Sequence, residues 1–212
     1  MLVLGIDLSI FEGSVSLARD GEVLSVSMWN QPRKHAEKVF IEIEKLLRDF
    51  NLSKDDIDLT VVTSGPGSFT GVRLSITVGK SLKVLGFDVK AVSTLELIGL
   101  NLVKLGVKTV SLISGRKGRF YTLLRESLES PLNVMDLTEE EVLYLLGNNE
   151  ECVVAYKGEI PKKIKENSRT FHETTPLGVY CSLLPFEHPF LLKPLHFYYV
   201  RDHDARPSCK GM

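Results

Sequence analysis

The sequence predicts an α/β protein in which two lobes each contain a sheet covered by helices. Apolar strand-like runs alternate with segments of helical spacing from the N-terminus to about residue 104, as is typical of α/β folds. An apolar strand pattern begins again at residues 107–114. We therefore expect a first lobe over residues 1–104 and a smaller second lobe over residues 105–212. A chain of 212 residues is long enough for both.

Apolar patterning and turn residues give the order of elements in each lobe. In the first lobe we expect a strand at 1–8, hairpin strands at 14–18 and 22–28, a helix at 34–50, a strand at 59–64, a helix ending near Gly86, a strand at 89–92 and a helix at 94–104. In the second we expect strands at 107–114, 120–125 and 152–156 and helices at 138–146 and 177–184. Prolines after residue 175 interrupt regular structure, so this lobe is predicted to be reduced.

The composition fits a folded protein that does not enter a membrane. Charged residues make up 25% and hydrophobic residues 43% of the chain, and no apolar run reaches transmembrane length. The formal net charge is -1, whereas a protein that binds nucleic acid by itself is usually basic, because phosphate neutralisation dominates such binding. The odd number and wide spacing of Cys152, Cys181 and Cys209 indicate reduced thiols in the cytoplasm.

A turn rich in glycine and serine, Ser64-Gly65-Pro66-Gly67-Ser68, joins a predicted strand to a predicted helix. Gly65 and Gly67 permit a tight bend, and Ser68 can cap the helix by accepting from a backbone N–H group. Such a turn could bind an anion, because backbone donors and the helix dipole converge there. It is not a Walker A loop, and the simpler interpretation, which we favour on chemistry alone, is a plain strand-to-helix connection.

Small residues recur at every fourth position of the helix after this turn, at Gly71, Ser75 and Gly79. They therefore form one row along one side of the helix. Each interior glycine costs about 1 kcal/mol relative to alanine, so the row indicates close approach of another backbone. Two interpretations remain open. The row faces a partner, which would make these three residues partner-binding, or it faces the protein's own sheet.

The predicted helix at 34–50 is apolar over more than one face. One stripe at helical spacing consists of Val39, Ile43, Leu46 and Phe50. Phe40 and Leu47 lie off this stripe. We interpret Phe40 and Leu47 as candidate partner-binding residues, while a broad stripe that faces the core explains the pattern equally well.

The run from Ser64 to Arg73, SGPGSFTGVR, resembles the signature of the bacterial TsaB (YeaZ) family. Further similar segments occur in the same order. They are Gly5–Ser9, Pro32–Ala36, Val92–Glu96 and Tyr199–Arg201. The resemblance is dense to about residue 100 and thin afterwards. It implies the actin-like, sugar-kinase and heat-shock ATPase (RNase H-like) superfold.

The resemblance also implies a function. TsaB proteins act with a catalytic paralogue, TsaD, and an ATPase, TsaE, to place a threonylcarbamoyl group on the adenosine next to the anticodon of tRNA. A TsaB-like chain is expected to be the non-catalytic subunit and to bind TsaD through paired helices. We also expect a homodimer when TsaD is absent and contact with tRNA mainly through the complex. ATP would be used on partner subunits, so no cofactor is expected for this chain.

In actin-like ATPases a carboxylate at the end of the first strand holds the water that solvates magnesium. Asp7 takes this place here, and Ser9 lies where a phosphate loop would turn. The alternative, which we favour, is that Asp7 caps the local turn. The second lobe has Ser114 where an aspartate is usual, and no Gly-Gly adenosine loop follows. We therefore expect no ATP hydrolysis by this chain alone. The basic cluster Arg116, Lys117 and Arg119 could contact an acidic partner or an RNA backbone, but we favour a solvated turn.

Two other functions would place different demands on the chain. A stand-alone actin-like ATPase or small-molecule kinase would use Asp7, Ser9 and the turn residues Gly65, Gly67 and Ser68. A metalloprotease would need metal ligands, but the sequence contains no His-x-x-x-His pair. The tail from Arg201 to Lys210 gathers His, Asp and Cys in a spacing that matches no zinc pattern. We expect no catalytic residue and no metal site in this chain.

Overall fold

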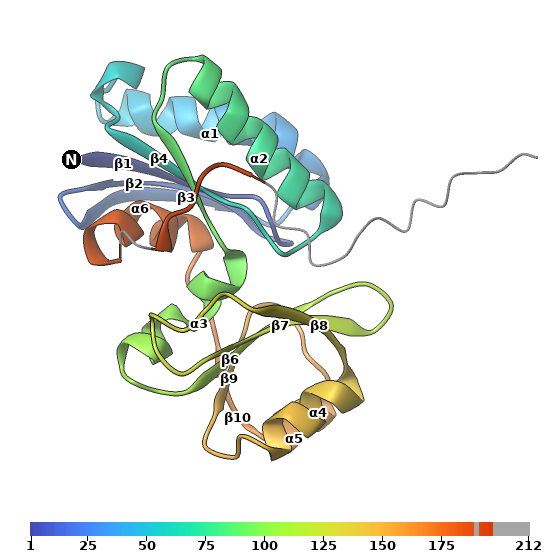
Figure 1. The fold of residues 1–212 in the computed structure, drawn as a ribbon. Coiled ribbons are helices and arrows are strands. Elements are labelled where there is room, and N and C mark those ends of the chain that lie inside the picture. Colours follow the sequence, from blue (N-terminus) through green and yellow to red (C-terminus); the bar gives the residue numbers. More distant parts are fainter. Residues whose placement is uncertain (189–190, 197–212) are drawn as a thin grey trace, which may run out of the picture.

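The computed structural model of the chain describes residues 1–188 and 191–196 and has two lobes, each built on a five-stranded sheet (Figure 1). The similar segment Tyr199–Arg201, Cys209 and the Arg201–Lys210 tail lie outside these residues. The α/β class with two lobes is confirmed.

The first sheet has the strand order β3-β2-β1-β4-β5. Its strands are β1 (Leu2–Asp7), β2 (Gly13–Arg19), β3 (Glu22–Trp29), β4 (Leu59–Thr63) and β5 (Val89–Val92). β1, β2 and β3 are antiparallel neighbours, whereas β1, β4 and β5 run parallel. All residues of β1 and β4 are buried, because helices cover both faces of the sheet (Figure 1). Their nearly continuous apolar sequences follow from this position.

The second sheet repeats this topology. Its strands are β6 (Thr109–Ser114), β7 (Arg119–Arg125), β8 (Val134–Thr138), β9 (Val153–Tyr156) and β10 (Arg169–His172), in the order β10-β9-β6-β7-β8. Read from the β8 edge, the order is β8-β7-β6-β9-β10, which corresponds strand by strand to β3-β2-β1-β4-β5 in the first sheet. The reduction predicted for this lobe concerns its helices, α4 (Glu139–Gly147) and α5 (Lys162–Glu166), and leaves the number of strands unchanged.

Two long helices, α1 (His35–Asp49) and α2 (Phe69–Val84), lie on one face of the first sheet (Figure 1). Short 3-10 turns at Pro32–Lys34 and Lys54–Asp56 flank α1. Val39, Ile43 and Leu46 of α1 enter the core shared with α2, as their spacing predicts. Phe50 lies just past the end of α1 and is 39% exposed, so the buried stripe ends at Leu46.

The last helix of each half packs on the other lobe's sheet. α3 (Thr94–Lys104) follows β5 but lies against β6, β7 and β9, while α6 (Leu177–Glu187) follows β10 but lies against β1 and β2. One apolar core therefore runs through both lobes and includes Val61 of the first sheet and Leu123 of the second. The helix predicted near 177–184 is present as α6, although it packs on the first lobe and not within the 105–212 unit.

Candidate functional site: the inter-lobe cleft and the outer helices

The carboxylate at the end of β1 is enclosed by its own lobe. Asp7 is 1% exposed. Its Oδ1 accepts hydrogen bonds from the Ser9 backbone N–H at 3.0 Å, the Ser9 hydroxyl at 2.6 Å and the Thr63 hydroxyl at 2.7 Å. Burial raises the pKa of Asp7, and these hydrogen bonds oppose the rise. Among the described residues, nothing donates a hydrogen bond to Oδ2. Asp7 thus takes part in a local turn, the interpretation that the sequence favoured.

The Ser64–Ser68 turn packs directly onto Ser9. A Cβ at Gly67 would lie 2.1 Å from the Ser9 carbonyl oxygen, so glycine is required by close approach of the protein's own backbone. Gly65 has a φ of 96° and its carbonyl accepts from the Thr94 N–H at 2.9 Å. Ser68 caps α2 by accepting from the Gly71 N–H at 3.0 Å. Of the five turn residues, Pro66, Gly67 and Ser68 line the cleft between the lobes.

The inter-lobe cleft has a volume of about 1460 Å³. Contacts between described residues cross it. The Lys157 ammonium lies 3.3 Å from the Glu12 carboxylate, and the Arg116 guanidinium lies 5.3 Å from the centre of the Phe69 ring. Lys157 also donates to the Thr175 carbonyl at 2.9 Å and is only 8% exposed. A cation of the second lobe is therefore held against an anion of the first inside the cleft.

The cleft residues do not fit a magnesium nucleotide in the manner of the actin-like ATPases. Asp7 and Ser9 are buried beneath the Ser64–Ser68 turn and do not line the cleft. Ser114 offers no carboxylate, and its hydroxyl donates to the Glu159 carbonyl at 2.8 Å. Within residues 1–188 and 191–196, no group of three or more His, Cys, Asp or Glu side chains is placed to hold a metal ion.

The small-residue row of α2 faces the protein's own lobe. A Cβ at Gly71 would lie 2.2 Å from the Leu8 carbonyl oxygen, and Ser75 is fully buried 3.2 Å from the Thr63 hydroxyl. A Cβ at Gly79 would meet Val62 at 3.2 Å and Leu195 at 3.0 Å. The close approach expected for this row is present, but it is made to Leu8 just after β1, to β4 and to the segment 191–196. Gly71, Ser75 and Gly79 therefore form no exposed surface, which corrects the partner-facing interpretation.

The segment 191–196 returns to the first lobe after α6 and lies across β5 and α2 (Figure 1, red). Its Lys193 exchanges two backbone hydrogen bonds with Ala91, at 2.9 and 2.7 Å. Leu195 packs on the core beside Gly79, while Leu191 is 3% exposed. The segment thus occupies part of the space that the small-residue row leaves beside α2.

Exposed apolar side chains remain on the outward sides of α1 and α2. Phe40 and Ile41 of α1 are 45% and 61% exposed, and Val84 and Leu85 at the end of α2 are 87% and 59% exposed. Leu47 is half-buried and packs on the core of the first lobe. Of the two residues predicted to face a partner from α1, Phe40 is thus available at the surface, and only part of Leu47 is.

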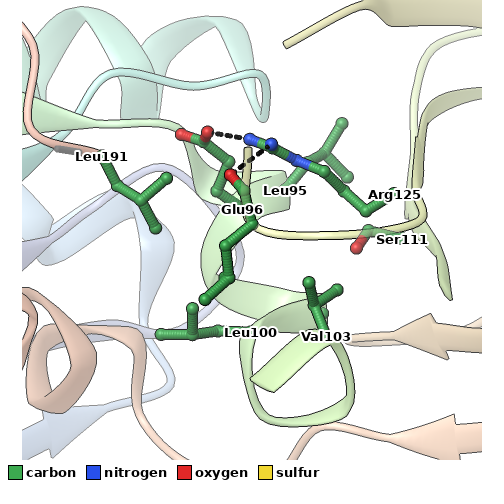
Figure 2. Close-up of a pocket in the computed structure, with 9 residues that line it drawn as sticks. Leu95, Glu96, Leu100, Val103, Ser111, Arg125 and Leu191 are labelled. Atoms are coloured by element: carbon green, nitrogen blue, oxygen red, sulfur yellow. Dashed lines mark hydrogen bonds and ion pairs between the residues drawn. The ribbon is translucent and has the colours of Figure 1, made fainter. Parts of the chain in front are cut away.

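A buried ion pair that sequence patterning did not single out lies beside α3. Figure 2 shows the guanidinium of Arg125 directed at the carboxylate of Glu96, with Leu191 at the edge of the same pocket. Both residues are at most 5% exposed. Burial raises the pKa of Glu96, although Arg125 and Lys193 oppose the rise. The sequence signal for this pair is the charged Glu96 in an otherwise apolar helix start. Its partner Arg125 lies 29 residues away, so no local pattern connects the two.

The chain has the two-lobed fold of the sugar kinases and actin-like proteins. The hexokinase of the ROK group from Thermus thermophilus aligns with a TM-score of 0.52 and 12% identity over 87% of this chain and 98% of its own. YeaZ from Pseudomonas aeruginosa aligns with a TM-score of 0.68 and 22% identity over 87% of this chain and 91% of its own. These likenesses establish the predicted superfold.

Sequence comparison identifies the family. The profile described as "TsaD: tRNA N6-adenosine threonylcarbamoyltransferase" matches residues 22–174. The "tRNA threonylcarbamoyladenosine biosynthesis protein TsaB" of Bacillus subtilis (strain 168) is 30% identical over 123 residues, which are 58% of this chain and 54% of that protein. The chain belongs to this threonylcarbamoyltransferase family, in its TsaB (YeaZ) branch.

The chain spans about half the length of the curated relatives that it matches. The match over residues 22–174 shows the family, whereas the activity, substrates and partners of this chain are proposals. In the described part of the chain, none of the helices has both the length and the apolar character needed to cross a membrane.

Proposed function

We propose that this chain is a non-catalytic assembly subunit. It supports a TsaD-type enzyme that places a threonylcarbamoyl group on the adenosine next to the anticodon of tRNA in the cytoplasm. In this proposal α1 and α2 bind TsaD, TsaE joins a larger complex, and a homodimer forms when TsaD is absent. ATP is used on the partner subunits, and tRNA is reached mainly through the complex.

One observation carries the non-catalytic part of this proposal. Asp7 is buried, is hydrogen-bonded by Ser9 and Thr63 and does not line the cleft, and the equivalent place in the second lobe is Ser114. Neither strand end presents a carboxylate to the cleft, so the pair of acidic groups that would position a metal and a water is not formed.

The assembly part rests on the outer helices of the first lobe. Phe40 and Ile41 are exposed on a helix whose inner stripe is already buried in the core. Exposed aromatic and aliphatic groups next to polar ones are typical of protein contacts. The family model carries the name TsaD, and the curated relatives include both TsaB proteins and tRNA N6-adenosine threonylcarbamoyltransferases, so a surface for a paralogous partner agrees with the comparisons.

Phe40→Asp tests this surface by retention of the chain on immobilised TsaD. The substitution places a charge in the centre of the proposed apolar contact, so we expect roughly tenfold weaker binding. The matched control is Tyr144→Asp, because Tyr144 is an aromatic residue that is 76% exposed on α4 of the second lobe. Binding by Phe40→Asp equal to that of the control would refute the surface, provided that thermal unfolding shows both variants folded.

A second function, a stand-alone ATPase or small-molecule kinase, is favoured by the cleft of about 1460 Å³ between the lobes. Titration calorimetry of the isolated chain with ATP and magnesium separates the two functions. Tight binding, together with turnover that is lost in Asp7→Ala, would establish the enzyme. Heat changes at the level of buffer alone would support the assembly subunit.

A further inference from the structure

Helix α2 carries charge of only one sign. Its charged residues are Arg73, Lys80 and Lys83, and its sequence contains no aspartate or glutamate. All three side chains are exposed, and at 1.5 Å per residue they extend over about 15 Å of the helix. Helical geometry places Arg73, Thr77, Lys80 and Val84 in one stripe, on the side of α2 opposite its buried small residues.

Exposed apolar groups lie on the same pair of helices as these cations and at the end of α2. α1 and α2 contact each other and share one core. Phe40 and Ile41 are exposed on α1, and Val84 and Leu85 at the end of α2. The outward charges of α1 are mixed in sign, and Glu44 is already paired with Arg48 at 2.5 Å. The outer face of the two helices therefore combines exposed apolar side chains with a positive band along α2.

We infer that this face fits a protein partner whose matching surface is acidic and apolar, and that it fits a second copy of this chain less well. The inference rests on the proposed function and specifies the partner of the same surface. A two-fold interface brings the same patch of both copies together. Two copies joined through α2 would oppose cation to cation, and like charges in an interface weaken it.

An RNA backbone is the other ligand with the right charge, but it fits this face less well. Phosphates are recognised by cations and polar donors, and contact with them uses no aliphatic side chains. The four exposed apolar residues on α1 and at the end of α2 would stay in water in such a complex. The formal net charge of -1 also gives no general attraction to RNA.

The test compares wild type with Lys80→Glu/Lys83→Glu in calorimetric titrations with purified TsaD at 0.1 M and 1 M NaCl. At the lower salt concentration we expect roughly tenfold weaker binding by the variant. The wild type should weaken at 1 M NaCl, because the screening length falls from about 10 Å to about 3 Å. The control is Lys162→Glu/Lys163→Glu, which reverses two exposed lysines on α5 and should bind like wild type.

Self-association is measured in the same buffers by analytical ultracentrifugation. The wild-type dimer should dissociate at a concentration at least roughly tenfold above the dissociation constant for TsaD. A homodimer as tight as the TsaD complex would overturn the inference. So would equal TsaD affinity of wild type and Lys80→Glu/Lys83→Glu, although that result would leave the proposed function standing.

Two further outcomes separate the remaining explanations. A wild-type chain that retains no TsaD refutes the proposed function and the inference with it. If Lys80→Glu/Lys83→Glu binds TsaD normally but no longer retains tRNA in a filter-binding assay of the complex, the cations serve RNA and the inference fails. Reduced TsaD affinity at unchanged thermal stability is the result that supports it.

Discussion

The two lobes share one strand order, but their equivalent strand ends differ in chemistry. β1 ends at the buried Asp7, whereas β6 ends at the exposed Ser114. The second strands of the two lobes, each seven residues long, end at Arg19 and Arg125. Arg19 is exposed, while Arg125 is buried against Glu96. The first lobe therefore buries Asp7 where the second has the uncharged Ser114, and the second buries Arg125 where the first has the exposed Arg19.

The two lobes also differ in the residues that bind their buried charged groups. In the first lobe the enclosed charge, Asp7, is bound by residues of the same lobe, and two long helices remain outside with exposed apolar groups. In the second lobe Arg125 is directed at α3, and Lys157 is directed at Glu12 across the cleft. Arg125 thus holds α3 on the second sheet, whereas Lys157 contacts the first lobe across the cleft.

The largest effect is expected from breaking the pair at the end of β7. Arg125→Met leaves the Glu96 carboxylate buried without its cation and should lower the free energy of unfolding by about 3–5 kcal/mol. The equivalent Arg19 lies at an exposed strand end, so Arg19→Met should change the free energy of unfolding by less than about 0.5 kcal/mol. Urea unfolding measures both. Glu96→Leu/Arg125→Met should recover most of the loss, and a double variant as unstable as the single one would contradict this account.

The next largest effect concerns the glycines of the two lobes. A Cβ at Gly71 of α2 would lie 2.2 Å from a backbone oxygen of Leu8, whereas a Cβ at Gly147 of α4 would meet no described atom within 4 Å. Gly71→Ala should therefore lower the free energy of unfolding by about 3 kcal/mol because backbone must shift. Gly147→Ala should be neutral or stabilise by up to about 1 kcal/mol. Thermal and urea unfolding measure both variants, and equal effects would show that α2 does not approach the Leu8 backbone so closely.

Gly71 also shows how much of the packing of α2 could be predicted from the sequence. The spacing of Gly71, Ser75 and Gly79 predicted a close backbone approach, which is present. Periodicity describes one helix in isolation, so it could not say whether that approach is made to the protein's own sheet or to a partner. For α1, the buried positions of Val39, Ile43 and Leu46 followed directly from their spacing.

Features that depend on distant parts of the chain could not be predicted. α6 is apolar on nearly all sides, so its pattern did not indicate that it packs on the first sheet. The Lys157–Glu12 contact joins residues far apart in the sequence, and no local pattern links a lysine after one strand to a glutamate after another. The composition of Ser64–Ser68 predicted a turn. Its packing onto Ser9 could not be predicted, because Ser9 lies in a distant segment of the sequence.

A third prediction uses the different strand ends, Asp7 and Ser114, and concerns pH. Burial raises the pKa of Asp7 above its ordinary value of 3.8, so the folded state binds a proton more readily than the unfolded state. The contribution of Asp7 to stability is therefore favourable at low pH and is lost as the pH rises from about 3.8 through the raised pKa. Asp7→Asn cannot titrate and should remove this part of the pH dependence. Ser114→Asn, at the exposed counterpart, should leave the wild-type profile unchanged.

Unfolding free energies of the wild type and both variants, measured by urea titration from pH 4 to pH 8, check this prediction. Glu96 also has a raised pKa because of burial, so a slope of the same sign remains in Asp7→Asn. The informative quantity is the difference between the wild-type and Asp7→Asn profiles. A difference that is constant across this range would show that Asp7 titrates in the folded protein as it does in the unfolded chain.

The smallest effects are expected at the helix N-caps, one in each lobe. Ser68 of the first lobe accepts from the Gly71 N–H at 3.0 Å in a partly buried position. Thr138 of the second lobe accepts from the Glu141 N–H at 3.2 Å in an exposed position, where water can replace a lost hydroxyl. Loss of a cap costs about 0.5–2 kcal/mol, so we expect Ser68→Ala near the upper end of this range and Thr138→Ala near the lower. Urea unfolding resolves this difference, and a larger loss for Thr138→Ala would mean that burial does not set the strength of these caps.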